Sequence, residues 1–211
     1  MEFIDKELEE YIHQHTTAET EILNQLVRAT ADELEYTDMI SGRQVGQLLK
    51  LLVRIGQYKR VLEVGTFTGY SAIWMADALP AGGEVITLEM NQKYAEISGK
   101  YFTSEPYNQK IKQLIGPALD TISNLEAQFD MMFIDADKHQ YPDYFLKLKP
   151  KLRVGGTLIA DNVLWGGEVL RANDPKSRAI FRMNRMIHED SDFENIILPV
   201  RDGIMLAVRI S

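Results

Sequence analysis

The sequence contains no cysteine, which excludes disulfide bonds and thiolate metal ligands. It also lacks any run of 18 apolar residues, so no segment has the composition of a membrane-spanning helix. The start of the sequence, MEFIDKELEE, is acidic and differs from a signal or transit peptide. Together these absences predict a cytoplasmic protein that does not enter membranes.

Positive charge is scarce as well. The 211 residues include 23 Lys and Arg against 31 Asp and Glu, a formal net charge of −8. This balance argues against indiscriminate nucleic-acid binding, although a local basic patch can still form. We expect residues 1–211 to form one domain, long enough to bury a substantial core. Within it we expect an N-terminal helical appendage over residues 1–38 and a catalytic core over 39–211.

The stretch at residues 60–71, RVLEVGTFTGYS, predicts a buried strand, a glycine turn and the start of a helix. Gly65 and Gly69 have G-x-x-x-G spacing, so the G-x-G-x-x-G pattern of a dinucleotide site is missing. Glu63, just before the turn, would repel a pyrophosphate but would suit a cationic amino group. S-adenosylmethionine carries such an amine, a sulfonium and no phosphate. The motif indicates either a site for this cofactor or an ordinary strand-to-helix turn.

A second acidic residue supports the cofactor interpretation. Residues 84–89, EVITLE, predict a strand that ends in Glu89, 24 residues after Gly65. A carboxylate at this point can accept hydrogen bonds from both hydroxyls of a ribose, as in other nucleotide-binding folds. The alternative is a solvated glutamate at a strand end, and we favour ribose binding.

Hydrophobic patterns predict an alternation of strands and helices along the rest of the chain. This alternation is typical of an α/β fold with a mainly parallel sheet and helices on both faces. Asp202-Gly203 is a hairpin signal that predicts an antiparallel pair at the sheet edge. Further strands are expected at 111–115, 129–135, 152–161, 193–200 and 204–210, and helices at 44–55, 91–102, 141–149 and 176–190.

Two more helices are expected within residues 2–35. The first has Phe3 on its apolar face, and Thr16 or Thr17 is expected to cap the second. Pro117 is expected at the first position of a later helix, where its missing N–H costs nothing.

Carboxylates also follow two later strands. Asp135, with Asp137 close behind it, ends the strand 129–135, and Asp161-Asn162 ends the strand 152–161. The carboxyl ends of parallel strands meet at one crevice, so we expect Asp135, Asp161 and Asn162 to lie together. Two carboxylates and an amide oxygen suit a divalent cation, Mg²⁺ first and Ca²⁺ or Mn²⁺ as alternatives. The competing interpretation is that these residues are helix caps or turn residues.

The motifs that carry chemistry occur together in a known order. The sequence resembles the metal-dependent O-methyltransferases of the caffeoyl-CoA and catechol type from about residue 39 to its end. The resemblance implies a Rossmann-like class I methyltransferase fold with a seven-stranded sheet, and usually a homodimer. It rests on MIS (39–41), LEVGTFTGYS (62–71), TLE (87–89), GPAL (116–119), FIDADKHQY (133–141), GGTLIADNVLWGG (155–167) and LPVRDGI (198–204).

The resemblance also implies roles for individual residues. Asp135, Asp161 and Asn162 would hold the metal, and Lys138 falls at the position of the family's catalytic lysine. The residues expected to line the S-adenosylmethionine site are Ser41, Glu63, Gly65, Thr66, Ser71, Glu89, Ala118, Asp135 and Asp137.

Two positions depart from the family pattern. Gly166 stands in W-G-G where W-N-G is usual, and Arg201 stands in P-V-R-D-G where glycine is usual. Both departures put an acyl-CoA substrate in doubt without affecting the expected methyl-transfer core.

The expected chemistry is transfer of a methyl group to a hydroxyl of a small vicinal-hydroxyl aromatic molecule. A metal would stabilise the oxyanion, and Lys138 would accept the proton if nearby positive charge lowers its pKa. One alternative is methylation of a hydroxylated tRNA base, because Arg178, Arg182 and Arg185 form a basic stripe at helical spacing. That stripe could instead be solvated or contact a second subunit. A non-catalytic S-adenosylmethionine-binding module is the third possibility.

Overall fold

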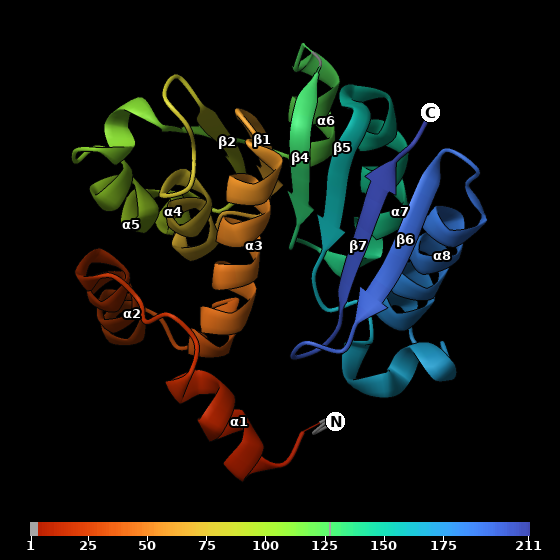
Figure 1. The fold of residues 1–211 in the computed structure, drawn as a ribbon, viewed down its shortest axis with the longest axis horizontal. Coiled ribbons are helices and arrows are strands. Elements are labelled where there is room, and N and C mark those ends of the chain that lie inside the picture. Colours follow the sequence, from red (N-terminus) through yellow and green to blue (C-terminus); the bar gives the residue numbers. More distant parts are fainter. Residues whose placement is uncertain (1–3, 127) are drawn as a thin grey trace.

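The computed structural model of the chain describes residues 4–126 and 128–211, so the predicted role of Phe3 lies outside the described residues. Its centre is a seven-stranded sheet in the order β3-β2-β1-β4-β5-β7-β6 (Figure 1). The first five strands in the chain are parallel, and the last two form an antiparallel hairpin beside β5. The predicted fold class is confirmed. The strands are β1 Arg60–Val64, β2 Glu84–Glu89, β3 Ile111–Ile115, β4 Phe129–Ile134, β5 Leu152–Ala160, β6 Phe193–Leu198 and β7 Ile204–Arg209.

Helices cover the parallel part of the sheet on both faces. Adjacent residues of a strand point to opposite faces, so Val61 packs with one apolar core and Leu62 with the other. Met131 and Met132 divide between the two cores in the same way. One core contains residues of α2 Glu21–Glu33, α3 Gly42–Gly56, α4 Tyr70–Ala76 and α5 Gln92–Phe102; the other contains residues of α6 Ala118–Asn124, α7 Tyr141–Leu148 and α8 Pro175–Glu189.

Short 3₁₀ turns join several of these elements. They are η1 Thr37–Met39, η2 Tyr107–Gln109, η3 Lys138–Gln140, η4 Lys149–Lys151 and η5 Trp165–Leu170. Pro117 occupies the N-cap of α6, one position before the site predicted for it. No helix in the described parts of the chain is long and apolar enough to cross a bilayer.

The N-terminal helices differ from the sequence prediction. The predicted cap of the second helix at Thr16 or Thr17 is wrong, because α2 begins at Glu21 after Thr20. The Thr16 hydroxyl instead donates to the Ile12 carbonyl at 2.7 Å and so belongs to the end of α1, Lys6–Gln14. A threonine hydroxyl can satisfy a carbonyl at a helix end as readily as it can cap the next helix.

The two helices also differ in how they attach. α1 has no buried residue and projects from the body of the molecule (Figure 1). In α2, by contrast, Leu23, Leu26 and Thr30 are fully buried. The Thr30 hydroxyl donates to Thr68 Oγ1 at 3.0 Å, which fixes α2 beneath the glycine turn. α2 therefore packs as part of the core, whereas α1 does not.

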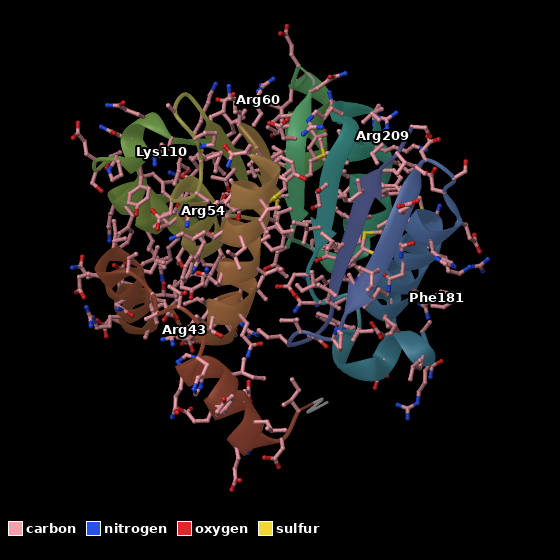
Figure 2. All side chains as sticks on the ribbon, viewed as in Figure 1. Arg43, Arg54, Arg60, Lys110, Phe181 and Arg209 are labelled. Atoms are coloured by element: carbon pink, nitrogen blue, oxygen red, sulfur yellow. The ribbon has the colours of Figure 1, made fainter. Side chains whose placement is uncertain are left out.

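Arg43, labelled in Figure 2, holds the connection between α1 and α2 against α3. Its guanidinium donates to the His13 carbonyl at 3.0 Å and pairs with Glu19 at 2.5 Å. Glu19 also accepts a hydrogen bond from the Tyr70 hydroxyl at 3.1 Å. This chain of contacts links the N-terminal segment to α4, whose first residue is Tyr70.

Candidate active site

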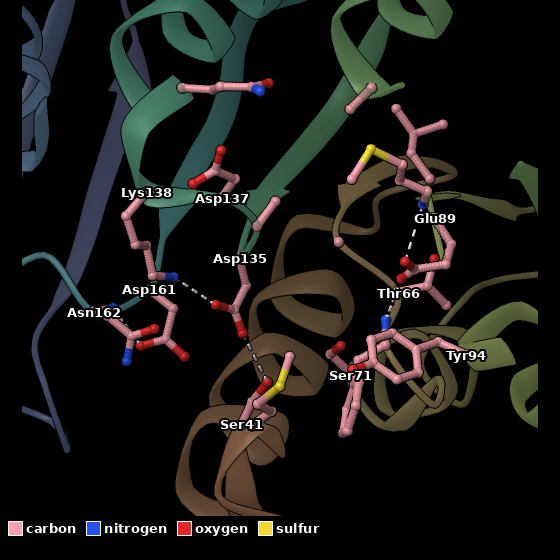
Figure 3. A pocket seen from close by; sticks show the side chains of 18 of the residues that line it. Ser41, Thr66, Ser71, Glu89, Tyr94, Asp135, Asp137, Lys138, Asp161 and Asn162 are labelled. Atoms are coloured by element: carbon pink, nitrogen blue, oxygen red, sulfur yellow. Dashed lines mark hydrogen bonds and ion pairs between the residues drawn. The ribbon is translucent and has the colours of Figure 1, made fainter. Parts of the chain in front are cut away.

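A cavity of about 610 Å³ lies at the carboxyl ends of the parallel strands. It is centred on β1 and β4, where the strand order reverses, which is the usual ligand position in such sheets. Figure 3 shows two groups of polar side chains in it, one around Glu89 and one around Asp135. Ser41, at the start of α3, lies between them.

Gly65 brings the two groups together. Its φ is +99°, and a Cβ at this position would overlap the backbone carbonyl of Asp135. Only glycine allows both the backbone angle and the approach. The turn after β1 therefore lies directly against the end of β4.

Glu63 lies behind the cavity wall and does not line it. As a strand residue it points to the face covered by α4 and is fully buried. Ser71 Oγ and Thr87 Oγ1 each donate to its carboxyl group at 2.5 Å, and Thr87 is its register partner in β2. Thr66 Oγ1 is 2.5 Å from Thr87 Oγ1. Glu63 thus reaches the cavity through Ser71, and through Thr87 to Thr66, and both Ser71 and Thr66 line it. Its role in the cofactor site stays a prediction.

Burial raises the pKa of Glu63 to about 8, although the hydrogen bonds from Ser71 and Thr87 lower it in part. The charge of Asp135 adds to the upward shift. At neutral pH the ligand-free protein therefore favours the protonated, neutral carboxyl group.

Glu89 is oriented by the backbone around it. One carboxylate oxygen accepts from the Phe67 amide at 2.8 Å, and the other accepts from the amides of Met90 and Asn91 at 2.9 and 2.8 Å. Burial raises its pKa in spite of these bonds. Phe67 and Tyr94 meet edge to face beside it, with ring centroids 4.9 Å apart. A fixed carboxylate next to aromatic rings suits a nucleoside.

Asp135 and Lys138 form the centre of the second group. The Lys138 ammonium donates to Asp135 Oδ1 at 2.9 Å and to the Tyr141 hydroxyl at 2.6 Å. Ser41 Oγ donates to the other oxygen of Asp135 at 3.3 Å. Burial lowers the pKa of Lys138, but Tyr141 and Asp135 raise it by a larger amount, so the net shift is upward. The condition that nearby positive charge lowers this pKa is not met in the ligand-free protein.

Asp161 and Asn162 complete this group. Asp161 is only 3 % exposed, and burial with the charge of Asp135 raises its pKa to about 7. Asn162 has a φ of +58°, and its side-chain amide makes no hydrogen bond within the described chain. Asparagine tolerates this left-handed backbone better than most residues.

This donor set fits a hard divalent cation. Burial and the charge of Asp135 together raise the pKa of Asp161, and a cation between the two carboxylates would stabilise their charged forms. The free amide oxygen of Asn162 is a suitable third ligand. Within the described residues no three His, Cys, Asp or Glu side chains form a metal centre, so a cation here would depend on this mixed set and on water.

The cavity contains every residue predicted for the site except Glu63. The lining residues that the sequence prediction missed include five aromatic residues and two cations; most of the others flank predicted residues. Trp165 and Arg201 belong to motifs already noticed in the sequence, whereas Lys176 and the remaining aromatic residues carry no chemical signal of their own. These aromatic residues are Phe67, Tyr70, Tyr94 and Tyr144. The predicted residues that line it are Ser41, Gly65, Thr66, Ser71, Glu89, Ala118, Asp135, Asp137, Lys138, Asp161 and Asn162.

The basic stripe of α8 lies outside the cavity. Arg178, Arg182 and Arg185 are all exposed. Arg178 donates to the Asn173 carbonyl at 2.5 Å, and Arg185 pairs with Glu189. These local contacts do not favour RNA binding over a solvated helix face.

The fold and the site together define a Rossmann-like methyltransferase. A family model described as O-methyltransferase matches residues 13–210. The chain belongs to this O-methyltransferase family, and it is an S-adenosylmethionine-dependent enzyme rather than a binding module.

Individual relatives agree with this assignment. The chain is 37 % identical to a catechol O-methyltransferase from Niastella koreensis over 77 % of this chain and 79 % of the relative. It is 32 % identical to caffeoyl-CoA O-methyltransferase 1 from Eucalyptus globulus over 92 % and 83 %. Among solved structures, the O-methyltransferase TomG from Streptomyces achromogenes in complex with SAM superimposes with a TM-score of 0.88 at 32 % identity, covering 97 % of this chain and 96 % of that one.

The raised pKa of Glu63 predicts a pH-dependent stability. The pKa of Glu63 in the folded protein is above the ordinary value of 4.5. Its contribution to the stability of the fold is therefore complete below pH 4.5 and is lost as the pH rises through about 8. The stability that Asp161 contributes is likewise lost as the pH rises through about 7, the raised pKa of its carboxyl group. The free energy of unfolding of the ligand-free protein should fall over this range. Glu63→Gln, which mimics the neutral acid, should remove the share of this fall that Glu63 causes, on the order of a few kcal/mol in the free energy of unfolding.

Denaturant titrations at several pH values measure this effect. Exposed Glu194→Gln serves as the control and should keep the wild-type pH dependence. Equal slopes in wild type and Glu63→Gln would show that Glu63 stays charged in the folded protein.

Proposed function

We propose that the enzyme transfers a methyl group from S-adenosylmethionine to a hydroxyl of a small aromatic molecule with vicinal hydroxyls, with the help of a divalent cation. The observation that carries this proposal is the contact of Gly65 with the Asp135 backbone, which joins a nucleoside-type pocket to a carboxylate and lysine cluster in one cavity. The names of the catechol and caffeoyl-CoA relatives support this acceptor class.

The nucleoside of the cofactor would lie in the half of the cavity near Glu89, with its ribose hydroxyls donating to that carboxylate. The methionine part would extend along the turn after β1 toward Ser41 and Ser71, since hydroxyls and backbone amides there can hold its amine and carboxylate. This orientation directs the sulfonium toward Asp135. The remaining cofactor contacts in the proposal are Gly65, Thr66, Ala118 and Asp137.

Asp135, Asp161 and Asn162 would hold the cation, most simply Mg²⁺. When bound, such a cation lowers the cost of ionising a coordinated hydroxyl and fixes its position. The acceptor oxygen, after release of its proton to water, attacks the methyl carbon, and the carbon–sulfur electron pair returns to sulfur. Positioning of the two reactants in one cavity is then the main contribution of the protein.

Lys138 is the proposed catalytic residue. Its upward pKa shift favours the ammonium form, so the role that fits best is stabilisation of the acceptor oxyanion by a fixed positive charge. Its hydrogen bonds to Asp135 and Tyr141 hold the ammonium in place.

Removal of the metal should abolish turnover without preventing cofactor binding. Asp161→Ala takes a charge and a ligand from the cation, so Mg²⁺-stimulated methylation of a catechol should be lost while calorimetry still detects S-adenosylmethionine. A chelator should have the same effect on the wild type, and added Mg²⁺ should reverse only the chelator. Exposed Asp143→Ala on α7 is the matched control. Full activity of chelated wild type and of Asp161→Ala would refute a metal mechanism.

Loss of Lys138 should affect the chemical step alone. Lys138→Ala should lower kcat by roughly 10²–10⁴, the range observed for acid–base and oxyanion contributions. Part of this activity should return at high pH, where the acceptor hydroxyl ionises without help. Lys147→Ala, an exposed lysine outside the cavity, should retain wild-type kcat, and a similar result for Lys138→Ala would remove Lys138 from the mechanism.

We also propose that the chain forms a homodimer through the uncovered face of β6 and β7, which faces the viewer in Figure 1 without a helix over it. Ile196 and Val208 on these strands are 53 % and 37 % exposed. Ile196→Asp should therefore give a monomer in light scattering, whereas Leu170→Asp, at an exposed position in η5, should not. A monomeric wild type would contradict this proposal.

A further inference from the structure

Arg201 is held at the cavity by contacts that only the fold creates. It lies in the turn between β6 and β7 with a φ of +51°, a backbone conformation that favours glycine. Its Nη1 donates to the carbonyls of Ile40, at 2.9 Å, and Ser41. Gly42 has no side chain to obstruct it, and a Cβ there would overlap Nη1. A cation thus occupies a strained turn position and is fixed against the loop that begins α3.

The guanidinium of Arg201 forms no ion pair in the described chain. Its Nε and Nη2 make no hydrogen bond with a side chain or backbone group that the structure describes. Three acidic residues of the cavity are bonded elsewhere: Asp135 to Lys138, Asp137 to His139, and Glu89 to backbone amides. The charge of Arg201 acts on the fourth, Asp161, and lowers its pKa in part, although no hydrogen bond joins the two side chains.

A second unpaired cation lines the same cavity from another element. Lys176, in the first turn of α8, has its Nζ 5.7 Å from the centre of the Trp165 ring. It forms no ion pair with a described carboxylate. The Trp165 ring gives this part of the cavity an aromatic surface.

We propose that Arg201 and Lys176 recognise a carboxylate on the acceptor, so that the acceptor is an aromatic acid with vicinal hydroxyls. This inference rests on the proposed methyl transfer and adds the charge of the acceptor. The planar guanidinium can donate two parallel hydrogen bonds to a carboxylate, and the ammonium adds a second charge. With the ring against Trp165 and the hydroxyls toward Asp161, the acid group extends to the cationic side. In a protein of net charge −8, such a local positive site favours the binding of an anionic substrate.

The test compares two acceptors of nearly equal size, 3,4-dihydroxybenzoate and 3,4-dihydroxybenzamide. Wild type should prefer the acid in kcat/KM by about tenfold, as expected for hydrogen bonds to a charged group. Arg201→Gly, which restores the usual glycine of the turn, and Lys176→Gln should each raise KM for the acid by about that factor and leave KM for the amide unchanged. Arg182→Gln removes a charge from the same helix as Lys176 but outside the cavity, and should behave as wild type.

Three results would overturn the proposal. The first is equal use of acid and amide by the wild type. The second is an equal rise in KM for both acceptors in Arg201→Gly together with an unchanged KM in Lys176→Gln. That result would mean that Arg201 only holds the loop at Ile40 and Ser41 in place. The third is that Arg201→Gly and Lys176→Gln raise KM for a hydroxycinnamoyl-CoA but not for 3,4-dihydroxybenzoate. That result would assign both cations to the phosphates of the coenzyme.

Calorimetry separates this inference from the proposed function. Both ligands are titrated into protein saturated with S-adenosylhomocysteine and Mg²⁺. If neither acceptor is methylated but the acid still binds more tightly through Arg201 and Lys176, the methyl-transfer proposal fails and the anion site stands. Equal affinities for acid and amide contradict the anion site whatever the turnover.

Discussion

The backbone contact between Gly65 and Asp135 determines how the rest of the site is arranged. β1 and β4 are neighbours in the sheet, although about 65 residues of chain separate them. The glycine lets the turn after β1 lie against the end of β4, so a cofactor pocket and a catalytic cluster share one space. A larger residue at this position would separate the two halves of the cavity.

Buried acidic groups surround this contact, and their energies are linked. The pKa values of Glu63 and Asp161 are both raised, chiefly by burial and partly by the charge of Asp135. The ligand-free protein therefore has lower stability at neutral pH than uncharged residues at these positions would give. A cationic ligand or metal in the cavity would stabilise the charged forms, which couples binding to the protonation of the site.

Much of this arrangement could be predicted because its signals are local. Glycine spacing, strand-end carboxylates and the rule for parallel sheets are enough to predict that Gly65, Glu89, Asp135 and Asp161 share one crevice. The position of Glu63 could not be predicted, since its burial depends on how α4 brings Ser71 over the strand. Only the fold brings Arg201 to the carbonyl of Ser41, 160 residues away in the chain. The N-terminus of α2 is difficult to predict because several threonines compete for one cap.

The most direct test of this account is a crystal structure of the protein with S-adenosylhomocysteine, Mg²⁺ and 3,4-dihydroxybenzoate. We expect ribose hydroxyls on Glu89, a cation held by Asp135, Asp161 and Asn162, and an acceptor hydroxyl between that cation and the cofactor sulfur. A cofactor bound outside the turn at Gly65, or an acceptor whose hydroxyls lie away from Asp135 and Lys138, would contradict it.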